Sequence, residues 1–184
     1  MKQKIVFDSY TKYALSKVEL QKVLGACDNL SDYILFLLAS RYGFRREDVV
    51  NIKVANVDLI HPSITYHEHK KGKDRTIPIE PDVVQELKRY KNTIGNREYL
   101  FPFRDGSTAW DHFQRVCLSA GVPVPPGRTG RPFHSLRGTC VKMRQAQGWS
   151  LNEVAALIGD EPETVARHYL CVTPAELATK MGIY

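Results

Sequence analysis

The segment from Asp32 to Tyr42 constrains the fold more than any other part of the chain. It contains the run YILFLLASRY, which is apolar on nearly every side of a helix, and Gly43 follows it directly. A helix without a polar face has to be surrounded by other elements, because none of its sides suits water. The sequence therefore predicts a central buried helix ended by Gly43. With 184 residues, the chain is long enough to form one domain around it.

The remaining segments predict an α+β fold that is mostly α-helical, with one small three-stranded antiparallel sheet. Capping-box patterns begin helices at Ser16 and Ser150, and a proline at a first helical position begins one at Pro81. Further helices are expected over residues 46–54, 109–120, 134–147 and 161–169, with a last short one from 174. Short strands are expected over residues 57–60, 64–69 and 75–79, and the turn between the last two, residues 70–74, is basic.

Composition narrows the class of protein. The net charge is +6, and residues 101–149 hold seven basic and two acidic side chains. Such a concentration suggests a polyanionic partner, with a solvated surface as the alternative. The four cysteines lie far apart, which favours neither a zinc site nor a disulfide framework. Because the chain has no signal peptide and no apolar run near the roughly 20 residues of a membrane span, we expect a cytoplasmic protein that does not bind membranes.

Four features place residues suited to phosphate chemistry along the chain. Arg45 closely follows a glycine, Lys70 lies in the expected hairpin turn, His134 and Arg137 form an HxxR pattern, and Tyr169 ends an expected helix. Each feature alone is common on protein surfaces or in packed cores. Their order and context make the combination specific.

In that order, the chain resembles the catalytic domain of the tyrosine recombinases, the phage integrase family. The resemblance covers about residues 16–173 and is carried by YILFLLASRYGFRREDVVNIKVANVDL, HKKGKDRTIPI and FHSLRGTCVKMRQAQGWSLNEVAALIGDEPETVARHYLCV. The family pattern has an acidic residue three positions after its first arginine. Asp48 meets this condition as a supporting residue and selects Arg45 over Arg46. The resemblance implies that fold and the activity of a DNA breaking-rejoining enzyme.

The catalytic residues implied are Arg45, Lys70 (with Lys71 as the fallback), His134, Arg137 and Tyr169. Arginine suits a phosphodiester because its paired N–H donors stay charged and match the non-bridging oxygens. Tyr169 would attack the phosphorus and form a covalent 3′-phosphotyrosyl intermediate. Lys70 would protonate the leaving 5′ oxygen, and His134 would contact the phosphate or take the tyrosine proton. This scheme needs neither a metal nor a cofactor.

Asp160 departs from the family pattern, which usually has histidine or tryptophan at this position. A carboxylate beside a scissile phosphate would repel it, unless it is protonated or turned toward an arginine or a helix N-terminus. We expect Asp160 to cap the following helix, 161–169. His168 is a weaker candidate for the missing donor, because neighbouring helix residues point about 100° apart.

The resemblance also sets expectations for domains and partners. Residues 1–15 are expected to be a leader or linker, and 16–184 the catalytic domain, including a C-terminal helix 174–184, with no N-terminal core-binding domain. The expected partners are double-stranded DNA and, on that DNA, three further copies in a tetramer. Contacts to the DNA backbone are expected from basic residues of the hairpin and of the loop before HSLR: Lys71, Lys73, Arg75, Arg128 and Arg131.

Two alternatives remain open beside a recombinase or integrase. The first alternative is a DNA-binding or regulatory module of the same fold that has lost cleavage. The second is an enzyme with type IB topoisomerase-like activity. Formation of a covalent protein–DNA adduct would exclude the first alternative, since only an enzyme forms one. Plasmid relaxation without recombinant product would favour the second.

Overall fold

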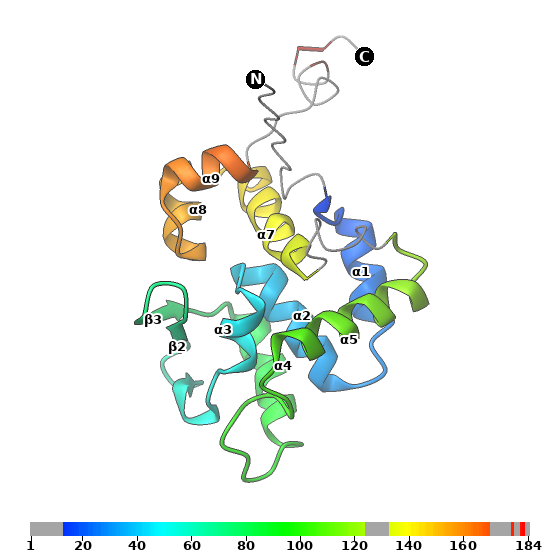
Figure 1. Ribbon diagram of the computed structural model, residues 1–184, viewed down its shortest axis with the longest axis vertical. Helices are drawn as coiled ribbons and strands as arrows, with labels where there is room; N and C mark the ends of the chain where they lie inside the picture. The colour runs from blue at the N-terminus through cyan, green and yellow to red at the C-terminus, as the bar shows by residue number, and fades with distance from the viewer. Residues whose placement is uncertain (1–12, 124–132, 170–177, 179–180, 183–184) are drawn as a thin grey trace, which may run out of the picture.

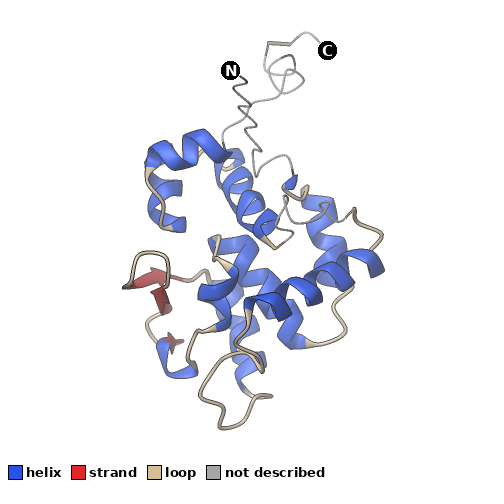
Figure 2. Ribbon diagram, viewed as in Figure 1, coloured by secondary structure: helices blue, strands red, loops and turns tan. Residues whose placement is uncertain are grey.

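The computed structural model describes residues 13–123, 133–169, 178, 181 and 182. Its helices surround one long central helix, and a small sheet lies at one edge (Figures 1 and 2). In chain order the elements are α1 (Lys17–Gly25), α2 (Leu30–Tyr42), α3 (Arg46–Val50), the 3₁₀ turn η2 (Val54–Asn56), β1 (Val57–Asp58), β2 (Ser63–Glu68), β3 (Lys73–Pro78), α4 (Pro81–Lys91), α5 (Gly106–Ser119), α7 (His134–Ala146), α8 (Leu151–Ile158) and α9 (Pro162–Tyr169).

Helix α2 is the centre of the fold, as its apolar sequence predicts. It packs against α7, α4, α3, α5 and α1, and most of its side chains are buried. It begins two residues earlier than expected, because the Asn29 side chain caps it by accepting from the Asp32 amide at 2.9 Å. Asp32 is instead inside the helix. Its buried carboxylate lies 2.6 Å from His112 Nδ1 and accepts a hydrogen bond from Arg115, and both residues belong to α5. At the other end Gly43 adopts φ 67°, a left-handed conformation that ends the helix.

Local signals set most helix starts. Both predicted capping boxes are present, one joining Ser16 to Glu19 and the other joining Ser150 to Glu153. Helix α4 begins at Pro81 and ends at Lys91, as expected. Helix α5 begins three residues earlier than expected, because Asp105 supplies its cap.

The helix expected over 46–54 is shorter, since α3 ends at Val50. Beyond it the backbone bonds to a distant segment: the Leu100 amide donates to the Ile52 carbonyl at 2.8 Å, and the Val54 amide donates to Glu98 at 2.9 Å. These non-local bonds replace the helical ones that local sequence favoured.

The sheet has the strand order β1-β2-β3, and both pairings are antiparallel. In the β2–β3 hairpin Ser63 lies opposite Pro78 and Glu68 opposite Lys73. The hairpin turn is therefore shorter than expected, because Lys73 and Asp74 belong to β3. Gly72, at φ 60°, allows the tight reversal.

Among the described residues, the buried side chains form two clusters. The larger surrounds α2, and the smaller joins α7, α8 and α9 through Cys140, Val141, Val154, Ala155, Ile158, Val165 and Tyr169. In Figure 1 α8 and α9 lie beside α7, with the β2–β3 hairpin near the end of α8. Arg75 of β3 ties the hairpin to α8 by donating to the Ala156 carbonyl.

Leu15, the last residue of the expected leader or linker, packs against the helices. Leu15 is 7% exposed within the larger cluster, and its amide donates to the Thr139 hydroxyl at 2.8 Å. Most of the expected C-terminal helix, 174–184, lies outside the described residues. Within the described part, no helix has both the length and the apolar character to cross a membrane.

Candidate active site

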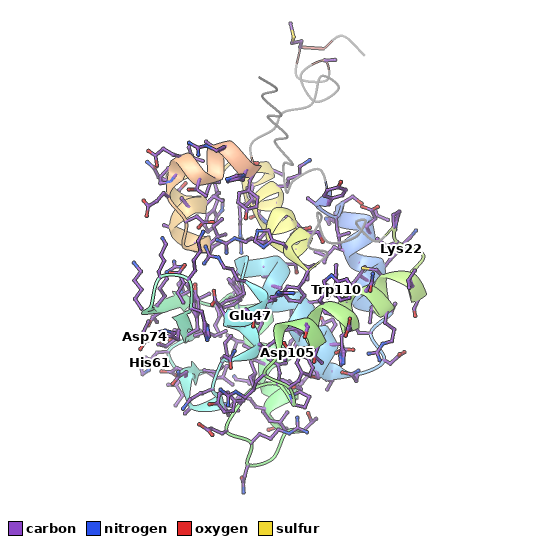
Figure 3. All side chains as sticks on the ribbon, in the orientation of Figure 1. Lys22, Glu47, His61, Asp74, Asp105 and Trp110 are labelled. Atoms are coloured by element: carbon purple, nitrogen blue, oxygen red, sulfur yellow. The ribbon has the colours of Figure 1, made fainter. Side chains whose placement is uncertain are left out.

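One cleft is lined by four of the five candidate catalytic residues, Arg45, Lys70, His134 and Tyr169. It has a volume of about 430 Å³ and lies between the start of α3, the β2–β3 turn, the start of α7 and α9. Glu47 and Trp110, both labelled in Figure 3, mark its α3 and α5 side. The cleft is lined by Arg45, Arg46, Glu47, Lys70, Trp110, Phe133, His134, Asp160, Thr164, His168 and Tyr169. Arg137, the fifth candidate, contacts the cleft through hydrogen bonds to two of its lining residues, Asp160 and Tyr169.

Arg45 is held by the junction between α2 and α3. It is the residue immediately before α3, and buried Phe44 anchors the chain just ahead of it. Its side chain is 16% exposed and meets three carboxylates: Glu68 at 2.7 Å, Asp160 at 2.6 Å and Asp48 at 3.8 Å. Arg46, by contrast, is largely exposed and pairs with its neighbour Glu47. Both arginines line the cleft, but Arg45 alone of the two contacts Glu68 and Asp160.

Arg137 is the second guanidinium of the site and is 1% exposed. It donates to the Asp160 carboxylate at 2.6 Å, to the Tyr169 hydroxyl at 3.2 Å and to the Gly43 carbonyl. Burial alone would lower the pKa of this guanidinium, but Tyr169 and Asp160 together raise it. Arg137 therefore stays charged at any working pH.

Tyr169 is the last residue of α9 and is buried, at 3% exposed. Its hydroxyl lies 2.8 Å from His134 Nε2 and accepts from Arg137 Nε. His134 is the first residue of α7, one turn before Arg137, so both side chains reach the same hydroxyl. A phenol oxygen in contact with an imidazole and a guanidinium has a proton acceptor and a stabilising charge within reach.

Lys70 enters the cleft from the hairpin turn. The Glu68 carbonyl closes this turn by accepting from the amides of Lys71 at 3.0 Å and Gly72 at 2.8 Å. The buried Asp48 carboxylate also accepts from the His69 amide at 3.0 Å, which ties the turn to α3. Asp48 therefore supports Arg45 and the Lys70 turn together. The fallback residue, Lys71, instead lies 3.5 Å from Glu161.

Asp160 does not cap α9 in the expected way. Helix α9 begins at Pro162, and the Glu161 carbonyl accepts its first intrahelical bond, from Val165. The two carboxylate oxygens of Asp160 are instead taken by Arg45 and Arg137, each at 2.6 Å. Burial alone would raise the pKa of this carboxyl, but Arg137, then Arg45 and Lys70, lower it below its ordinary value. Asp160 is thus an ionised bridge between the two arginines.

Glu68 belongs to the site although sequence reasoning missed it. Its side chain is 0% exposed, and Oε1 accepts from Arg45 at 2.7 Å. Its Oε2 has no hydrogen-bond partner among the described residues. The signal was present in the alternation of β2, where Ile64 and Tyr66 point inward and Glu68 follows them on the same face.

The other candidate residues differ in where their side chains lie. His168 lines the cleft beside Tyr169, and Lys73 is exposed on the hairpin. Arg75 turns inward, donating to the Tyr66 hydroxyl at 2.8 Å as well as to α8. Arg128 and Arg131 lie outside the described residues. DNA contacts by all of these residues stay predictions.

Chemically, the cleft is suited to a tetrahedral anion beside a phenol. Two guanidiniums, an imidazole and an ammonium group converge there, from Arg45, Arg137, His134 and Lys70. No group of three or more metal-ligating side chains occurs among the described residues. The groups that are present can bind and polarise a phosphodiester and place an oxygen nucleophile next to it.

Known proteins resemble this chain in sequence and in fold. The tyrosine recombinase XerA of Pyrococcus horikoshii is 26% identical over 173 residues, which is 89% of this chain and 58% of that protein. The chain thus spans less than two thirds of that curated relative. A crystal structure of XerA recombinase superposes with a TM-score of 0.77 at 20% identity, covering 92% of this chain and 64% of that one.

A second structure, of XerH site-specific recombinase in a post-cleavage complex with its palindromic difH substrate, gives a TM-score of 0.74 at 17% identity. It covers 93% of this chain and 52% of that one. These likenesses confirm the predicted fold, helical with a small antiparallel sheet. The family model for the phage integrases matches residues 14–176, nearly the whole chain. The chain therefore belongs to the phage integrase family.

Proposed function

We propose that this chain is the catalytic part of a site-specific DNA recombinase or integrase, which cuts and rejoins duplex DNA through Tyr169. The observation that carries the proposal is the Tyr169 hydroxyl, held 2.8 Å from His134 Nε2 and 3.2 Å from Arg137 Nε in a cleft that also holds Arg45 and Lys70. Family membership supports the same conclusion.

In the proposed reaction, Tyr169 Oη attacks the scissile phosphorus while its proton passes to His134. The bond from phosphorus to the 5′ oxygen breaks, and Lys70 gives that oxygen a proton. Arg45 and Arg137 hold the non-bridging oxygens, on which charge builds in the transition state. The product is a 3′-phosphotyrosyl bond and a free 5′ hydroxyl. Attack by a 5′ hydroxyl from another strand reverses the steps and completes strand transfer.

The proposed partners are duplex DNA and three further copies of the chain on that DNA. XerH, one of the structural neighbours, is bound to a DNA substrate. Such an enzyme would act in the cytoplasm, on a chromosome or a mobile element.

The test is a nicked suicide substrate resolved on a denaturing gel. The cognate site is unknown, so a library of mixed-sequence nicked duplexes comes first. Wild type is expected to give a slow protein–DNA band, and Tyr169→Phe is expected to give none, because it lacks the attacking oxygen. Tyr99→Phe is the matched control, since Tyr99 packs under Arg104 away from the cleft. An adduct of undiminished yield in Tyr169→Phe would disprove the assignment.

One observation favours the second candidate, a DNA-binding module without cleavage. Asp160 places a negative charge on both arginines that a phosphate would use. If the wild-type chain shifts its cognate DNA in a native gel but never forms the covalent band, this candidate replaces the first.

A further inference from the structure

We propose that the Asp160 carboxylate occupies the phosphate position of the resting site, so that a DNA phosphate has to displace it. This arrangement is called self-occupation below. The proposal rests on the function proposed above and adds a regulatory contact to it. The contact is an internal one, made by a residue of the same chain.

The geometry of the carboxylate resembles that of a bound phosphate. One oxygen accepts from Arg45 Nη2 and the other from Arg137 Nη2, both at 2.6 Å. Guanidinium groups bind carboxylates and phosphates through the same paired-oxygen geometry. Asp160 also lines the cleft beside Lys70, His134 and Tyr169. It therefore lies where an anion bound to both arginines would lie.

The charge of the site is already balanced without DNA. Arg45, Arg137 and Lys70 supply positive charge, and three carboxylates oppose them. Two of those carboxylates, Asp48 and Glu68, are 2% and 0% exposed and lie behind Arg45. Asp160 differs from them, because it faces the cleft and contacts both arginines.

A phosphodiester that entered beside an ionised Asp160 would meet a like charge at close range, and this repulsion opposes binding. Binding to both arginines therefore requires the Asp160 side chain to leave them. Its backbone is held, since the Asp160 amide donates to the Ala155 carbonyl at 3.1 Å. The movement is thus a rotation of the side chain, and binding is weakened by the arginine contacts that are given up.

Titration with inorganic phosphate tests this without knowledge of the DNA site. Phosphate that binds the folded state raises the melting temperature by mass action, and chloride keeps the ionic strength constant. Asp160→Asn and Asp160→Ala are expected to bind phosphate at least about tenfold more tightly than wild type. Glu161→Gln is the matched control: it removes one adjacent negative charge, but Glu161 contacts Lys71 and neither arginine.

A second measurement observes the arginine contact directly, through the Arg137 side chain. The Arg137 Nε–Hε resonance is identified by its loss in Arg137→Lys. In wild type it is expected to stay in place at phosphate concentrations that move it fully in Asp160→Asn. If it moves equally in wild type, or if both Asp160 variants bind phosphate no better than Glu161→Gln, self-occupation is overturned. Weaker binding by the variants would also overturn it and make Asp160 a residue that positions the arginines.

The adduct assay separates this proposal from the proposed function. Asp160→Asn is expected to form more Tyr169 adduct than wild type on the same suicide substrate. Adduct formation by wild type with no gain in phosphate binding would leave the recombinase function standing and remove self-occupation. Tighter phosphate binding with no adduct in either protein would support self-occupation and count against the recombinase function.

Discussion

The three carboxylates around Arg45 affect both its position and its attraction for a phosphate. Its guanidinium is surrounded by Asp48, Glu68 and Asp160, and each carboxylate comes from a different element or link. Removing one partner of a buried ion pair costs about 3–5 kcal/mol, because the other charge stays buried. The same contacts that hold Arg45 in place also lower its net attraction for a phosphate.

The lowered pKa of Asp160 predicts how stability depends on pH. Burial opposes the shift, but Arg137, Arg45 and Lys70 lower the pKa, so the ionised form stabilises the fold. This contribution is complete above the ordinary aspartate pKa of about 4 and is lost as the pH falls through the lower folded-state value. In urea unfolding, wild type should therefore be more stable than Asp160→Asn, by an amount that stays constant from about pH 8 to 5.

Below about pH 4 that difference should shrink. The exposed pair of Glu161 with Lys71 serves as the comparison, since Glu161→Gln should change stability little at any pH. A difference that already vanishes between neutrality and about pH 6 would contradict the ionised bridge.

At the scale of elements, the junction of α2 and α3 organises the site. Gly43 ends α2 at φ 67°, its carbonyl accepts from Arg137, and Arg45, two residues later, immediately precedes α3. The glycine also packs against α8, since a Cβ there would lie 2.6 Å from Ile158 Cγ2. One turn therefore positions both arginines and the helix that leads to Asp160.

Gly43→Ala is expected to destabilise the chain by roughly 2–4 kcal/mol, combining left-handed strain of about 1 kcal/mol with overpacking of about 1–3 kcal/mol. It should also reduce adduct formation, because Arg137 and α8 have to move. Gly95→Ala is the control: Gly95 has φ 59°, but a Cβ there would meet nothing within 4 Å. Equal losses of stability in urea unfolding for both variants would show that the clash with Ile158 does not matter.

At the scale of the whole molecule, the buried residues that the structure describes pack into one large cluster and one small one. The small cluster joins α8 and α9 to α7. Its links to the hairpin and to α3 are polar, through Arg75 with Ala156 and Arg45 with Asp160. Tyr169, the proposed nucleophile, thus belongs to a part of the molecule with less apolar burial than the α2 core.

Hydrogen exchange should show this difference. Regions with few buried apolar contacts open at a lower free energy than the core. Amides of α8 and α9 are expected to exchange at least about tenfold faster than those of α2, and Asp160→Asn should speed exchange in α9 while leaving α2 unchanged. A single common exchange rate for all three helices would indicate that the molecule opens only as a whole.

Much of the fold could be predicted because its signals are local. The apolar run of α2, the capping boxes at Ser16 and Ser150, and Pro81 each act within one or two turns of helix. The prediction was wrong where distant segments intervene. Helix α3 stops at Val50 because Ile52 and Val54 bond to the segment around residues 98–100, which no local pattern announces.

The order of the elements could be predicted from short-range periodicity and capping patterns, and the resemblance to the tyrosine recombinases indicated the family and the five candidate catalytic residues. Which charges face one another depends on contacts between segments that lie far apart in the sequence. Arg45 meets Asp160 across 115 positions of sequence and Glu68 across 23, and Arg137 reaches back 94 positions to the Gly43 carbonyl. A carboxylate's role depends on the charges within a few ångströms of it, so the bridge formed by Asp160 exists only once α3, α7 and the link between α8 and α9 are brought together.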